Sequence, residues 1–125
     1  MQKRENGEVE VINAGRLAEI EVDASHATGD LNIYPGDANA PHYVLTHDLS
    51  GAVVVGINVR NARKGMVARV ARNSATPSAN AVTVKSGTAA GGSTLGRAIA
   101  ASRNGFVEAK FDGSAWIFVG MSEHT

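Results

Sequence analysis

The chain contains no cysteine among its 125 residues. This absence excludes a disulfide framework, a cysteine-ligated zinc site and a cysteine nucleophile. No apolar run approaches the roughly 18–20 residues that a bilayer-spanning helix needs, so we expect no membrane partner. Lysine and arginine together number 12, and so do aspartate and glutamate. A nucleic-acid-binding domain usually carries a strong basic excess, so we expect no nucleic-acid partner.

Large apolar side chains are also scarce. Alanine provides 20 of the 54 hydrophobic residues, and aromatic residues make up only 5% of the chain. The length fits one domain. Burial stabilises by about 25 cal/mol per Å² of apolar surface, and alanine offers little of it. We therefore expect part of the apolar surface to be buried between subunits or against a partner. The alternative is an ordinary monomer with small, tight packing.

The charges are unevenly distributed along the chain. Residues 1–62 carry a net charge of −5, and residues 63–125 carry a net charge of +5. Such asymmetry suits charge-complementary contact between neighbours in an assembly. Two solvated faces of opposite sign account for it equally well.

Alternation of apolar and polar residues is the recurring period of the sequence, and it predicts β-strands. The strongest example is 52–59, in which Val53, Val55 and Ile57 share one face. The segment 94–103 fits a short helix, or a strand that a tight turn at Asn104 and Gly105 joins to the next; we favour the strand. The other predicted strands span 8–12, 18–22, 31–34, 42–46, 66–72, 81–86, 106–111 and 116–120.

About eight or nine short strands with little helix favour an all-β fold. We expect an antiparallel β-sandwich, or a jelly-roll-like barrel. Strands 8–12 and 18–22 form a plausible hairpin. The polar segment 1–7 is predicted to be an N-terminal arm, and 8–125 a single β domain. Residues 116–119 (WIFV) are apolar on both faces, which is typical of a central strand or of one under an interface.

Catalytic and metal motifs are not apparent. There is no HExxH spacing, no G-x-S-x-G elbow, and no phosphate loop at 87–93. The acidic residues near the N-terminus alternate with apolar ones, as on the wet face of a hairpin: Glu8, Glu10, Glu19 and Glu21. We expect no enzyme activity, cofactor or metal. The competing hypothesis is a small jelly-roll hydrolase with a metal on His42 and His47. His26, Asp30, Asp37 and Asp48 lie nearby in sequence and are residue types that bind divalent ions, whereas surface histidines in loops are the plainer interpretation.

Two groups of residues are candidates for contact with a partner. A basic run could bind an acidic protein, although charges at strand ends also prevent edge-to-edge aggregation. It comprises Arg60, Arg63, Lys64, Arg69 and Arg72. Tyr34 and Tyr43 flank the loop 35–41, which is the only plausible aromatic-rimmed ligand site, whereas two half-buried tyrosines at strand ends are the plainer interpretation.

The C-terminal half carries a recognisable pattern. It runs GMVARVARNS (65–74), NAVTVKSG (80–87) and VEAKFDGSAWIFVG (107–120), with an Asp-Gly turn followed by tryptophan. The turn residues and the large apolar anchor Trp116 are structural rather than catalytic. Residues 65–120 resemble the small β-modules of tailed-bacteriophage virion proteins, found in capsid decoration proteins, head fibres and tail fibres.

The resemblance implies a virion structural protein, often a trimer, that acts by burying surface on a shell or fibre. We therefore expect a non-enzymatic capsid decoration (cement) protein, made in the host cytoplasm and located on the capsid surface. Its partner would be the major capsid protein or another virion protein, and a homotrimer is favoured. A head-fibre or tail component that binds a receptor or glycan is the alternative. To the basic run, Trp116 and Phe118 are added as candidate interface residues.

Overall fold

The computed structural model describes residues 19–22, 25, 27–37, 42–46, 48–74, 77 and 79–124. The predicted arm 1–7, strand 8–12 and its hairpin turn lie outside the described residues. The described part is nearly all β, as the sequence predicted. It contains no helix that is long and apolar enough to cross a bilayer.

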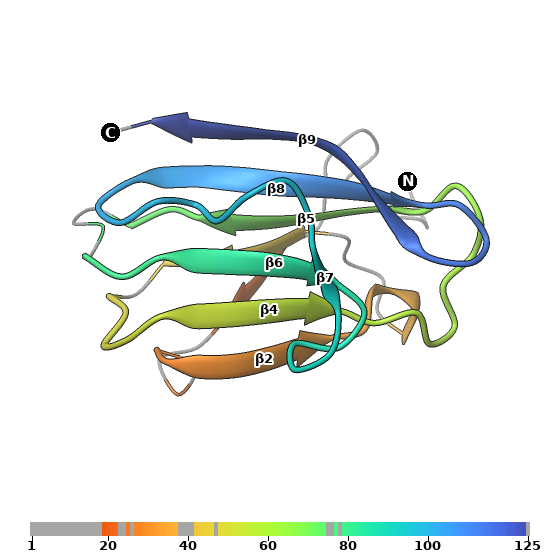
Figure 1. The fold of residues 1–125 in the computed structure, drawn as a ribbon, viewed down its shortest axis with the longest axis horizontal. Helices are drawn as coiled ribbons and strands as arrows, with labels where there is room; N and C mark the ends of the chain where they lie inside the picture. Colours follow the sequence, from red (N-terminus) through yellow and green to blue (C-terminus); the bar gives the residue numbers. More distant parts are fainter. Residues whose placement is uncertain are drawn as a thin grey trace, which may run out of the picture.

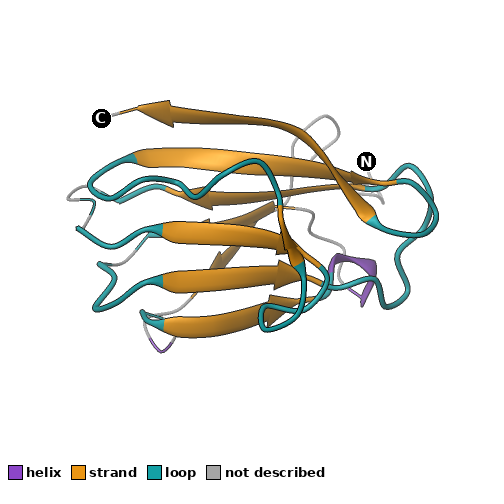
Figure 2. Cartoon of the chain, in the orientation of Figure 1, coloured by secondary structure: helices purple, strands orange, loops and turns teal. Residues whose placement is uncertain are grey.

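Figures 1 and 2 show the strands and the short 3-10 helix η2, which lies between the second and third of them. The elements are β1 (Glu19–Val22), β2 (Gly29–Ile33), η2 (Pro35–Asp37), β3 (His42–Leu45), β4 (Val53–Ile57), β5 (Val67–Arg72), β6 (Val82–Ser86), β7 (Ser93–Thr94), β8 (Asn104–Phe111) and β9 (Trp116–His124).

The strands form two mixed sheets. One has the order β1-β3-β5-β8-β9 and the other β2-β4-β6-β7. From β1 to β6 consecutive strands alternate between the sheets, so each circuit of the chain adds one strand to each sheet (Figure 1). Strands β1, β3 and β5 are therefore parallel, as are β2, β4 and β6. The antiparallel strands β7, β8 and β9 complete the C-terminal end of this stack.

The prediction of antiparallel sheets is therefore wrong for the first six strands. Alternation reports that one face of a strand is buried, and it does not report strand direction. A chain that returns to the same sheet makes an antiparallel pair, whereas a chain that first visits the opposite sheet returns in the parallel direction. The same alternating pattern suits both paths.

The buried faces of both sheets contribute to one hydrophobic cluster. Val55 and Ile57 enter it from β4, and Val70 enters from β5. Trp116, at the start of β9, is only 1% exposed and packs against Phe111 with ring centroids 5.2 Å apart. Its indole N–H donates to the Asn58 carbonyl at 3.0 Å, so the one polar atom of this large side chain is satisfied.

The strand predicted within 94–103 is largely absent. Ile99 makes an isolated bridge to Val82, and the backbone is otherwise irregular up to Arg103. Gly96 and Ser102 adopt positive φ angles of 64° and 62°, which interrupt an extended chain. The predicted turn at Asn104 and Gly105 is also wrong, because both residues belong to β8.

Candidate functional site

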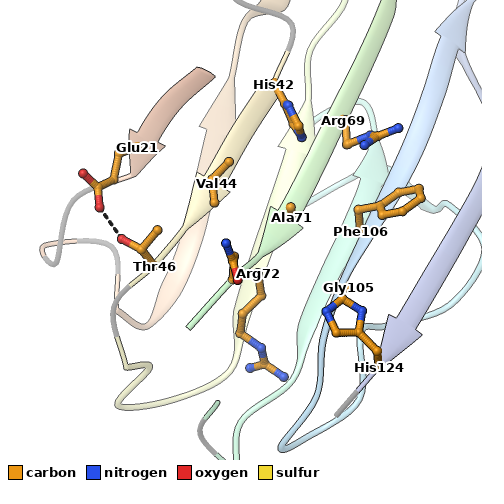
Figure 3. A pocket seen from close by; sticks show the side chains of 11 residues that line it. Glu21, His42, Val44, Thr46, Arg69, Ala71, Arg72, Gly105, Phe106 and His124 are labelled. Atoms are coloured by element: carbon orange, nitrogen blue, oxygen red, sulfur yellow. Dashed lines mark hydrogen bonds between the residues drawn. The ribbon is translucent and has the colours of Figure 1, made fainter. Parts of the chain in front are cut away.

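The outer face of the five-stranded sheet is hollowed into a cavity of about 590 Å³. Its floor is formed by residues of neighbouring strands that lie opposite one another in the sheet. His42 on β3 is opposite Arg69 on β5, and Arg69 is opposite Glu108 on β8. In the next row Val44, Ala71 and Phe106 follow the same order. Figure 3 shows His42, Arg69, Val44, Ala71 and Phe106 on these neighbouring strands.

Arg69 is the central cation of this face. Its Nη2 donates to Glu108 Oε2 at 3.3 Å, and its guanidinium lies 4.1 Å above the Phe106 ring. An ion pair and a cation–π contact together hold the side chain flat against its own sheet. Glu21 on β1 accepts a hydrogen bond from the Thr46 hydroxyl at the other side of the floor (Figure 3). The cavity therefore presents charged and hydrogen-bonding side chains that could contact a polar partner.

Arg72 has a different role from the other members of the basic run. It is 1% exposed and donates to the carbonyls of Arg103 at 2.8 Å, Ala100 at 2.6 Å and Asn80. Burial lowers the pKa of its guanidinium, and the nearby Glu123 carboxylate opposes that shift. Arg72 therefore ties together segments that are distant in sequence, and it does not present its charge to a partner.

A second hollow, of about 400 Å³, lies beside the first strands β1 and β2 and includes both predicted ligand tyrosines. Tyr43 is buried in the core, and this burial raises the pKa of its phenol. Tyr34 is half-buried, with the Arg60 guanidinium 4.1 Å above its ring. Arg60 also pairs with Asp37 at 2.6 Å. Hydrogen bonds from Asn61 and Arg60 lower the pKa of Asp37, which therefore stays a carboxylate.

The five basic residues thus lie in different surroundings. Arg60 is engaged at the Tyr34 hollow, and Arg63 and Lys64 are exposed in the loop between β4 and β5. Arg69 lies on the outer sheet face, while Arg72 is buried. The structure supports a basic loop at 60–64 and does not place all five on one surface.

The edge strand β9 presents the most exposed run of large apolar side chains. Ile117, Phe118 and Val119 are 48%, 40% and 55% exposed. Among the described strands β9 pairs with β8 alone, so in this part of the chain it is an edge strand rather than a central one. The Phe118 ring lies against the backbone of Gly96, where a Cβ would come within 2.6 Å of it. Trp116, the other predicted interface residue of this strand, is buried in the core.

Among the described residues no group of three or more His, Cys, Asp and Glu side chains is arranged to hold a metal ion. His26 and His47 lie outside the described residues, and His42 lines the cavity on the outer sheet face. Comparisons with family models, with curated proteins and with solved structures find no match to this chain.

Proposed function

We propose that the chain is a non-enzymatic structural protein of a tailed-phage virion, a capsid decoration protein that binds the outer shell as an oligomer. The observation that carries the proposal is the apolar run Ile117, Phe118 and Val119 on a sheet edge that no other described strand pairs. Contiguous exposed apolar surface at a sheet edge is characteristic of proteins that act by association. The virion assignment itself rests on the resemblance of residues 65–120.

Such a protein acts through surface that it buries between neighbouring shell subunits. Each bound copy adds contact area where internal pressure would separate them. The exposed basic loop with Arg63 and Lys64 suits an acidic patch on the shell, which would accelerate and orient binding.

For the architecture we propose a two-layer β-sandwich rather than a closed barrel. In the described part of the chain each sheet has two edge strands, β1 and β9 in one and β2 and β7 in the other. A closed barrel has no such edges.

The proposal is tested on virus particles that lack the chain. We expect such particles to lose their contents at a lower temperature than complete particles, and added purified protein to restore the original temperature. Equal heat resistance with and without the protein would show that it does not reinforce the shell.

The second hollow favours an alternative, a head-fibre or tail component that binds a receptor or glycan. Tyr34, Asp37 and Arg60 supply an aromatic ring, a carboxylate and a guanidinium around one concave surface. A glycan array distinguishes the alternatives. Binding that Tyr34→Ala abolishes would favour the receptor role, and an array without hits would count against it.

A further inference from the structure

Within the described part of the chain, strand β9 is paired along only one side of its backbone. All its pairs in the described structure are with β8, from Phe111 opposite Trp116 to Asn104 opposite His124. Natural edge strands are usually protected by lysine or proline, by a β-bulge that twists the edge, or by a covering segment. Residues 116–122 contain neither of these residues and no charge at all.

The exposed side chains of this edge are concentrated at one point along it. Ile117, Phe118 and Val119 are consecutive, so they offer apolar surface on both faces of the sheet. A β-bulge lies at the same point, because Ala109 is opposite Phe118 while Glu108 is opposite Gly120. Val119 is thereby left out of the β8 ladder. In Figure 1 β9 forms the upper rim of the molecule.

We propose that β9 pairs antiparallel with β9 of a second copy of this chain, about a two-fold axis at Phe118. This inference specifies the homo-oligomer of the proposed function, although it rests on the geometry of the edge rather than on the resemblance. In this register Ile117 of each copy is opposite Val119 of the other, and the two Phe118 residues face each other. The two five-stranded sheets become one continuous sheet, as in β-strand addition.

A second copy fits this edge because the edge is self-complementary. The uncharged run meets itself, so no like charges lie opposite each other within it. The antiparallel register brings the turn at Asp112 near the far end of the partner's β9. The carboxylates at these two places, Asp112 and Glu123, each have a cation of their own chain nearby. Lys64 attracts Asp112, and Arg97 pairs with Glu123 at 2.7 Å.

The first test is the solution mass of the purified protein by light scattering, for the wild type and for two lysine variants. Val119→Lys places a charge at the proposed interface. Val59→Lys is the matched control, since Val59 is 47% exposed but lies in the loop after β4. We expect a dimer for the wild type and for Val59→Lys, and at least a tenfold weaker dimer for Val119→Lys. A wild-type monomer, or a dimer that Val119→Lys leaves intact, would overturn the inference.

The second test examines the register directly. The chain has no cysteine, so one introduced thiol reports one contact. Directly opposed residues of an antiparallel pair have Cα atoms about 4.5–5.5 Å apart, within the range of a disulfide. Oxidised Phe118→Cys should therefore run as a covalent dimer, whereas Val59→Cys should remain monomeric under denaturing conditions. Absence of the Phe118→Cys cross-link in a folded dimer would refute this register.

These outcomes separate the inference from the proposed function. A wild-type trimer would overturn the two-fold pairing, and shell binding could still be observed with it. A dimer that ignores capsids would support the β9 pairing and contradict the decoration role.

Discussion

Replacement of Arg72 by methionine should destabilise the fold strongly. The guanidinium of Arg72 is buried and donates to three backbone carbonyls, those of Asn80, Ala100 and Arg103. Methionine fills a similar volume but donates no hydrogen bond, so all three carbonyls lose this donor. A hydrogen bond from a charged donor contributes about 1.5–3 kcal/mol. The Ala100 carbonyl keeps the Arg103 N–H as a donor at 3.2 Å, so the main loss falls on the bonds to Asn80 and Arg103.

We therefore expect Arg72→Met to lower the free energy of unfolding by about 3–5 kcal/mol, a large part of the roughly 5–15 kcal/mol of a typical domain. Urea denaturation followed by tryptophan fluorescence measures this value, because the single Trp116 lies in the core. Arg72→Lys keeps the charge but has one ammonium in place of a planar fork, so it should lose less.

The matched control is Arg63→Met, which alters an exposed arginine of the same basic run. Exposed substitutions of this kind usually change stability by less than about 0.5 kcal/mol. An Arg72→Met variant as stable as Arg63→Met would refute the structural role of Arg72. Arg72 would then again be a candidate interface residue.

Three further predictions concern turns and packing. Gly56→Ala should destabilise the protein in thermal melts, because its Cβ would collide with the backbone of Ala89. An unchanged midpoint would contradict this close approach. Trp116→Phe should cost about 1–3 kcal/mol, because the Asn58 carbonyl loses the indole N–H; a neutral result would mean that water replaces it. Hydrogen bonds from its own turn lower the pKa of Asp112 below its usual 3.8, so its stabilisation is present at neutral pH and is lost as the pH falls below about 4. Asp112→Asn should lose less stability on acidification than the wild type, and identical acid profiles would argue against the turn's role.

The positions of most strands were predictable because alternation marks a half-buried strand. The strongest prediction, 52–59, contains β4, and 66–72 contains β5. The path of the chain between strands was not predictable from alternation. Parallel pairing depends on which sheet the chain visits next, and no residue of β4 or β6 encodes that choice locally.

The burial of Arg72 could have been predicted from the sequence. It was missed because Arg72 was grouped with the other basic residues by its position along the chain rather than by its face of the strand. Arg72 lies in phase with Ala68 and Val70, and alternation places all three on the buried face of β5. Arg69 is out of phase with them and lies on the outer face. The face of a strand therefore predicts the role of a charge better than membership in a run does.

The two tyrosines and the WIFV run (116–119) show what the sequence alone could not predict. Tyr34 and Tyr43 flank one loop in the sequence, and the structure places both at one hollow, but it buries Tyr43 in the core. The apolar run was interpreted as either central or interfacial, and only the order of the described strands placed β9 at an edge of their sheet. Strand order is a tertiary property, so a local pattern could not decide it.

The most direct test of the proposed decoration role is the binding of the purified protein to DNA-free capsids of a tailed phage whose genome carries its gene, measured by co-sedimentation over a range of protein concentrations. The account predicts saturable binding, with a fixed number of copies per capsid and an accompanying rise in capsid heat resistance. Protein that stays in the supernatant at every concentration, with capsid stability unchanged, would contradict it.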